Sequence, residues 1–68
     1  SFGLSTEELV KLEIYNALGV RVKTIADGRF SAGRYHFRWN GSRAPSGVYF
    51  ARLSTGRSDE VVKMLLLK

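Results

Sequence analysis

The 68-residue sequence predicts an all-β fold, a sandwich or barrel built from short antiparallel strands. Three observations carry this prediction. Apolar and polar residues alternate with a period of two in several segments, as they do in strands with one buried face. Turn-forming glycine and asparagine residues separate these segments at intervals of about ten to fourteen residues. The length is sufficient for one domain only, so a single small β domain over residues 1–68 is expected.

The N-terminal third contains the one segment with two competing interpretations. Ser5–Glu8 matches the pattern of a helix capping box and would begin a helix. The segment that follows, Leu9–Leu18, alternates apolar and polar residues from Val10 to Ile14. This alternation fits a strand better than the stripe of an amphipathic helix, so we predict a strand that a turn at Gly19 ends.

Two segments precede the only proline. Val20–Ala26 alternates and predicts a second strand, which the turn dipeptide Asp27-Gly28 is expected to end. Arg29–Gly33 is then a connector. The clearest alternation in the chain follows, with aromatic residues on one face of a predicted strand and basic residues on the other. The aromatic residues are Tyr35, Phe37 and Trp39, and the basic residues are Arg34, His36 and Arg38.

The C-terminal third predicts two strands joined by a short turn. Ser42–Gly47 contains the proline and is expected to be a loop, and Val48–Leu53 alternates as a strand after it. Thr55–Ser58 is a turn signal, and the last strand is Val61–Leu67, which carries apolar residues on both faces. Five strands are thus predicted, and Phe2–Leu4 is a candidate for a further short one.

The sequence offers no arrangement of residues suited to catalysis or metal binding. His36 is the only histidine and the chain has no cysteine, so a transition-metal site lacks its usual ligands. The adjacent carboxylates Glu7-Glu8 and Asp59-Glu60 point to opposite faces of an extended chain, so neither pair forms an acid–base couple. We therefore expect no enzyme activity, catalytic residue, cofactor, metal or small-molecule substrate. No apolar run approaches the length of a transmembrane segment.

The formal net charge is +5, which suggests an acidic partner without naming one. Basic residues interleaved with aromatic ones also occur in oligonucleotide-binding barrels. Here the aromatic residues share one face, as they do when they pack into a core, and buried rings cannot stack on bases. A single-stranded nucleic-acid binder is thus only a remote alternative, and nucleic acid is not the expected partner.

Two local signals favour structural roles. Tyr49 lies near the start of a late strand, where a tyrosine of an immunoglobulin-like sandwich can bond its hydroxyl to an upstream turn. Asn40-Gly41-Ser42 satisfies the pattern of a glycosylation site, but Asn-Gly is also a common turn dipeptide, and the turn interpretation is favoured.

Several motifs, taken in order, resemble two related groups of domains. Val10–Gly19 is similar to their first signature, and the resemblance continues through Ala32-Gly33, Trp39–Gly41 and Pro45–Phe50 to Lys63–Lys68. One group is the C-terminal sorting domains of the type IX secretion system. The other is the immunoglobulin-like domain of flagellar hook-assembly proteins. Both imply a small immunoglobulin-like antiparallel β-sandwich of about six to seven strands.

The sorting-domain resemblance implies a non-catalytic module that directs a secreted cargo protein across the outer membrane. The expected partners are the outer-membrane secretion machinery and a cargo domain on the N-terminal side. The expected location is the periplasm in transit and then the cell surface or the medium. Such domains usually begin with a strand containing Asn-Pro, of which only Phe2–Leu4 matches the tail, so we expect a C-terminal module with a truncated first strand, or else a divergent member of the group. By motif match, recognition is expected at Gly47, Val48, Tyr49, Lys63, Leu65, Leu67 and Lys68.

The alternative function is an immunoglobulin-like structural or interaction module, either in a flagellar hook scaffold or as an accessory domain of a secreted hydrolase. The last strand is compatible with both functions. Its second face carries Val61, Leu65 and Leu67, and two interpretations are open: a small sandwich leaves these side chains incompletely buried, or both faces are simply core and rim. An incompletely covered edge or apolar patch is a docking surface in either case.

Overall fold

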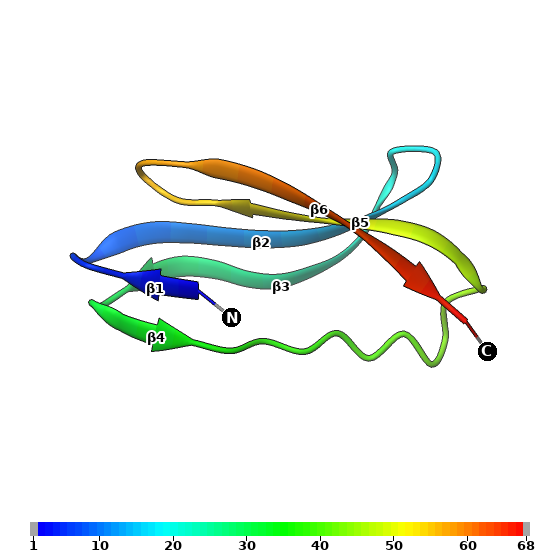
Figure 1. Cartoon of the computed structure of the whole chain (residues 1–68), viewed down its shortest axis with the longest axis horizontal. Helices are drawn as coiled ribbons and strands as arrows, with labels where there is room; N and C mark the ends of the chain where they lie inside the picture. Colours follow the sequence, from blue (N-terminus) through cyan, green and yellow to red (C-terminus); the bar gives the residue numbers. More distant parts are fainter. Residues whose placement is uncertain (1, 68) are drawn as a thin grey trace.

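The computed structural model describes residues 2–67 and folds them into two antiparallel sheets (Figure 1). The strands are β1 (Phe2–Leu4), β2 (Glu8–Asn16), β3 (Arg21–Phe30), β4 (Gly33–Tyr35), β5 (Gly47–Ser54) and β6 (Asp59–Leu66). The larger sheet has the strand order β3-β2-β5-β6, and the smaller sheet pairs β1 with β4. The described part of the chain is therefore an all-β fold, as predicted.

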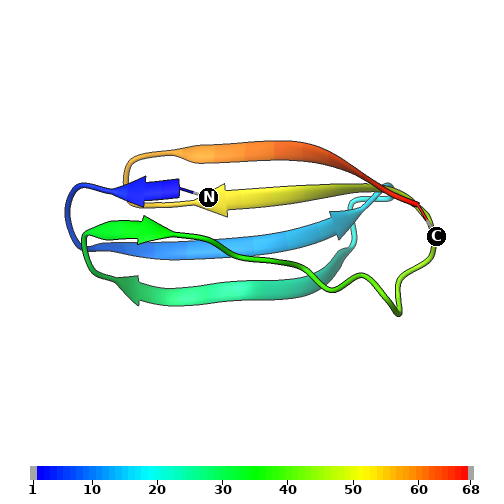
Figure 2. The ribbon, with the colours of Figure 1, turned by 60° about the horizontal axis from the view of Figure 1, so that its bottom comes forward.

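The two sheets form two layers of unequal extent. Figure 2 shows β1 and β4 lying over one face of the larger sheet, at the end where β2 begins. From β4 the chain continues as the irregular segment 36–46, which runs along the same face toward the opposite end. The second layer thus consists of two short strands and one extended segment, and it covers only part of the larger sheet.

The core lies between these layers. Val10 and Ile14 of β2 are each only 2% exposed, and Leu4 and Ala26 are also buried. Aromatic rings from the second layer and from the end of β3 extend this core, with ring centroids 5.1 to 6.4 Å apart. The rings belong to Phe2, Phe30, Tyr35 and Phe37. Offset and edge-to-face pairs of this kind add stability beyond the area that they bury.

The interpretation of Leu9–Leu18 as a strand rather than a helix is confirmed by β2. The possible short strand Phe2–Leu4 is also present, as β1. The turn after β2 forms at the expected glycine, because Gly19 has a φ of 81°, which an L-residue adopts only with strain. The Asn16 side chain fixes this turn by accepting hydrogen bonds from the backbone N–H groups of Leu18 and Val20 at 2.9 and 3.0 Å.

The predicted turn at Asp27-Gly28 is wrong. Strand β3 continues through both residues to Phe30, and its register pairs Asp27 with Lys11 and Gly28 with Val10. The long ladder with β2 supplies backbone hydrogen bonds at these positions, so pairing overrides the local turn preference. The chain instead reverses direction between Phe30 and Gly33.

The predicted strand through Tyr35, Phe37 and Trp39 is only partly correct. Regular pairing ends at Tyr35, because β1 offers only three residues as a partner. The predicted faces are nevertheless kept. The three aromatic side chains are half-buried, whereas the intervening basic residues, including His36, are exposed. Residues 2–67 contain no helix that is long and apolar enough to cross a membrane.

Candidate interaction surface

Most of the residues that the sequence singled out for recognition lie side by side in the structure. Gly47–Tyr49 begins β5, and its register places these residues opposite the C-terminal half of β6. Gly47 pairs with Leu66, Val48 with Leu65, and Tyr49 with Met64. Lys63 also lies on β6, and Leu67 is the first residue after the end of β6. Lys68 lies outside the described residues.

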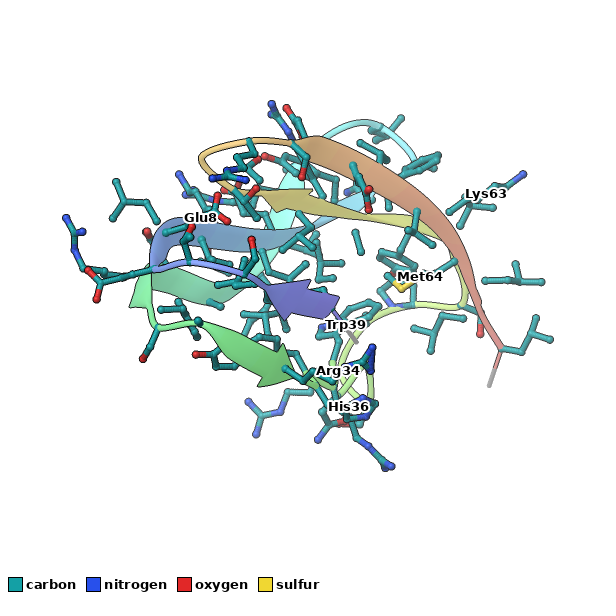
Figure 3. All side chains as sticks on the ribbon, turned by 60° about the vertical axis from the view of Figure 1, so that its left-hand side comes forward. Glu8, Arg34, His36, Trp39, Lys63 and Met64 are labelled. Carbon is teal, nitrogen blue, oxygen red and sulfur yellow. The ribbon has the colours of Figure 1, made fainter. Side chains whose placement is uncertain are left out.

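The pairing divides these residues between the two faces of the larger sheet. Directly paired residues share a face, and successive residues alternate. Tyr49 is only 4% exposed and faces the second layer, so its neighbour Val48 faces away from that layer together with Leu65. Figure 3 shows the same alternation on β6, where Lys63 and Met64 project to opposite sides of the strand.

An apolar surface without a covering layer results on the outer face of β5 and β6. We call Val48, Phe50, Val61 and Leu65 the outer-face patch. Leu65 is 65% exposed and Val61 is 60% exposed, while the two residues on β5 are half-buried. The expectation that the last strand carries poorly covered apolar side chains on its second face is confirmed.

The patch borders the free edge of the larger sheet. β6 is the last strand in the sheet order, so one side of its backbone has no partner strand among residues 2–67. Val62 faces the second layer but is still 58% exposed, because that layer does not reach over β6. An edge strand with exposed apolar residues on both faces is a template for pairing with another chain.

Tyr49 fixes the inner side of this region as the sequence predicted. Its hydroxyl donates a hydrogen bond to the backbone carbonyl of Pro45 at 2.6 Å. Its ring also packs on Trp39, with centroids 5.0 Å apart. This hydrogen bond therefore ties the loop before β5 to the sheet, so Tyr49 supports the fold.

A charged cluster lies on the outer face of β2, beside the patch. Glu13 is only 6% exposed, although it faces away from the second layer. It accepts hydrogen bonds from the Tyr15 hydroxyl at 3.0 Å and from the Arg21 guanidinium at 3.1 Å, and the Lys11 ammonium lies 3.8 Å away. Burial alone raises the pKa of Glu13, but these bonds and the two nearby cations outweigh it, so the pKa lies below its ordinary value.

Arg52 and Asp59 form a second ion pair between β5 and β6. The Arg52 Nε lies 3.0 Å from Asp59 Oδ1, and a second guanidinium nitrogen contacts the other carboxylate oxygen. The hydrogen bonds from Arg52 lower the pKa of Asp59 and outweigh the opposing effect of its partial desolvation. Bidentate pairs of this kind fix side-chain geometry, so Arg52 lies at a defined position on the outer face.

Sequence reasoning missed one member of the patch. The sequence carries no separate prediction for Phe50, and the register places it between Tyr15 and Lys63 on the outer face. Its position two residues after Val48 was the available signal, because residues i and i+2 of a strand share a face. As for metal binding, residues 2–67 contain no group of three or more His, Asp or Glu side chains that could hold an ion.

The comparison with protein families supports one of the two groups that the motifs resemble. The sequence model of the family described as "FlgD Ig-like domain" matches residues 4–59. The chain belongs to this family. The match covers most of the described sandwich and confirms the immunoglobulin-like fold.

The FlgD Ig-like match supports the flagellar hook-assembly part of the resemblance. It gives no support to the type IX sorting domain, so the sorting role stays a prediction. No curated protein matches the chain. No solved structure matches it either.

Proposed function

We propose that the chain is a non-catalytic immunoglobulin-like structural and interaction module that docks on a protein partner. The contact surface is the outer-face patch together with the free edge of β6. The observation that carries the proposal is the exposure of Val61 and Leu65 side by side with Val48 and Phe50 on one ordered sheet. Contiguous exposed apolar side chains on a small folded domain are typical of interaction sites.

The geometry favours a protein surface as the occupant. Full burial of one Leu or Val side chain contributes about 1.5–3 kcal/mol, so burying Val61 and Leu65 favours docking by at most about 3–6 kcal/mol before the entropy cost of association is subtracted. Lys63 lies between Val61 and Leu65 on this face and pairs with Phe50, and Arg52 pairs with Val61, so charged and apolar side chains alternate on this surface. Non-obligate protein–protein interfaces contain a similar mixture of apolar and polar surface.

The state of the carboxylates supports a non-catalytic role. Glu13, Glu7 and Asp59 each form an ion pair with an arginine. For Glu13 and Asp59 this pairing lowers the pKa, which stabilises the ionised form. A general acid needs the opposite shift, because it must hold a proton near neutral pH. These carboxylates stabilise the outer face rather than performing proton transfer.

The family match makes a flagellar hook scaffold the leading setting, and the partner we propose is the hook subunit. The test is a titration of the purified domain with purified hook subunit, followed by fluorescence anisotropy. We expect binding, and we expect Leu65→Lys to weaken it about tenfold or more because a charge replaces a buried contact. Leu9→Lys is the matched control, since Leu9 is 62% exposed on the same face but lies at the other end of the sheet.

Absence of binding, or equal loss with both lysine variants, would contradict the proposal. The sorting role is tested separately by attaching the chain to a periplasmic reporter in a host with a type IX secretion system. We expect the folded fusion to stay in the periplasm. Export that depends on Lys63–Lys68 would overturn the scaffold proposal in favour of sorting.

A further inference from the structure

A groove of about 860 Å³ lies at the end of the sandwich where β2 ends and β5 begins. One wall is the turn over Asn16–Gly19, and the other is the loop formed by residues 39–47. The groove and the outer-face patch share Val48, but Phe50, Val61 and Leu65 do not line the groove, and the lining includes Tyr49, which faces the opposite side of the sheet.

Both walls are held in place by hydrogen bonds. Asn16 closes the turn with its side chain, and its backbone N–H donates to the carbonyl of Val20 at 2.9 Å. In the loop, the Asn40 side chain accepts a bond from the backbone N–H of Ser42 at 3.0 Å. Tyr49 fixes the same loop through Pro45. The groove therefore exists before any ligand binds, which reduces the ordering entropy that a ligand must overcome.

The lining combines apolar and aromatic side chains. Trp39 lies against Tyr49 with an angle of 59° between the ring planes, and both rings form part of the floor. Leu18 and Val22 line the groove from the β2–β3 side, and they are 88% and 44% exposed. Such a lining suits an apolar or aromatic side chain of a bound segment.

The charged residues that line the groove are all positive. Lys23 and Arg43 belong to the lining, which contains no Asp or Glu. Within residues 2–67, neither of these cations has an ion-pair partner, whereas Arg21, Arg29 and Arg52 each have one. The imbalance extends beyond the groove, since the chain carries six arginines and no acidic residue between Asp27 and Asp59.

We infer that this groove binds an acidic peptide segment that carries an apolar side chain. The apolar side chain packs against Trp39, and the carboxylates face Lys23 and Arg43. Unpaired cations around a closed apolar floor favour anionic partners and speed their association. A single-stranded nucleic acid fits less well, because stacking several bases needs several exposed rings, and this groove offers one half-buried indole.

Trp39 supplies the assay, because it is the only tryptophan in the chain and lies in the groove. The probe is the peptide acetyl-Glu-Leu-Glu-Phe-Glu-amide, and its neutral counterpart has glutamine in place of each glutamate. We expect the acidic peptide to change the tryptophan emission with a Kd between about 10 µM and 1 mM. The neutral peptide should bind at least about fivefold more weakly, and added salt should reduce the difference.

Charge-reversal variants locate the site. Arg43→Glu and Lys23→Glu change exposed residues, so the fold should persist, and circular dichroism verifies this. Each is expected to weaken the acidic peptide about five- to tenfold. Arg57→Glu is the matched control, because Arg57 lies in the exposed β5–β6 turn at the opposite end of the larger sheet and should change the affinity less than about twofold.

Four results would overturn the inference. They are equal affinity for the two peptides, no binding at millimolar peptide, equal weakening by Arg57→Glu, and tighter binding of an oligothymidylate of similar length. The outcome is independent of the hook-subunit test. Leu65 does not line the groove, so Leu65→Lys should leave the affinity for the acidic peptide unchanged even if hook-subunit binding is lost.

Discussion

Removing the Tyr49 hydroxyl tests how the loop before β5 is held. In Tyr49→Phe the ring stays, so its packing on Trp39 is kept, but the 2.6 Å bond to the Pro45 carbonyl is lost. Because Tyr49 is buried, water does not readily replace its hydroxyl, and the lost bond costs about 1–2 kcal/mol. An unfolding entropy of about 2.1 cal/mol/K per residue converts each kcal/mol into about 7 °C for this chain length, so Tm should fall by about 7–14 °C.

Tyr35→Phe is the matched control. The Tyr35 hydroxyl donates to the Ser31 carbonyl at the same distance of 2.6 Å and across the same separation of four residues, but this bond is exposed. Solvent replaces an exposed bond, so the expected cost is below about 0.5 kcal/mol, or less than about 4 °C in Tm.

The assay is urea unfolding followed by the fluorescence of Trp39, together with a thermal melt by circular dichroism. We expect the urea midpoint to fall in Tyr49→Phe with an unchanged slope, since the surface exposed on unfolding is the same. Equal effects of the two substitutions would refute the reasoning, because it ascribes the difference to burial. An unchanged midpoint in Tyr49→Phe would show that the bond does not hold the loop.

Three further predictions concern stability and use the same urea assay. The folded-state pKa values of Glu13 and Asp59 lie below their ordinary values of 4.5 and 3.8. The free energy of unfolding should therefore be constant above about pH 5 and fall as the pH drops below it. Stability that rises on acidification would contradict this. Ile14→Ala, at a residue 2% exposed, should cost about 2–5 kcal/mol, and a cost below about 1 kcal/mol would show that the core is placed wrongly. Gly19→Ala should destabilise by about 1–2 kcal/mol because of the positive φ, whereas Gly28→Ala, in a strand with open space for the added carbon, should stabilise by about 0.5–1 kcal/mol; the same sign for both would contradict the account.

The strands that the sequence predicts correctly are those whose alternation agrees with their long-range pairing. β5 pairs with β2 on one side and with β6 on the other along most of its length, and each of the three strands shows its own apolar alternation. The role of Tyr49 was also predictable, because it depends on a turn only four residues upstream. Where the local pattern and the tertiary contacts agree, a strand or a side-chain role can be predicted from a single sequence.

The errors occur where the partner strand decides the outcome. Asp27-Gly28 has strong turn preference, but nine-residue β2 continues opposite it and extends the ladder. The alternation from Tyr35 to Trp39 is strong, but three-residue β1 ends the pairing. Strand length and partner availability are properties of the assembled sheet, and neither segment carries a local signal for them.

Only the part of the candidate surface that depends on local alternation was predictable from the sequence. Apolar residues on the second face of β6 follow from alternation alone. Their contact with Val48 and Phe50 depends on the β5–β6 register, which the sequence does not specify. The burial of Glu13 depends further on the irregular register between β2 and β3, where a bulge follows Leu12.

The central claim is that the outer face of β5 and β6 is the surface through which this FlgD Ig-like domain docks. An amide chemical-shift map of the isotope-labelled domain, recorded with and without purified hook subunit, tests it most directly. The account predicts that the largest shifts fall on Val48, Phe50, Val61 and Leu65, and that Leu65→Lys abolishes them. Shifts confined to the opposite layer, around Arg34 and His36, would contradict it, as would an unchanged spectrum (Figure 3).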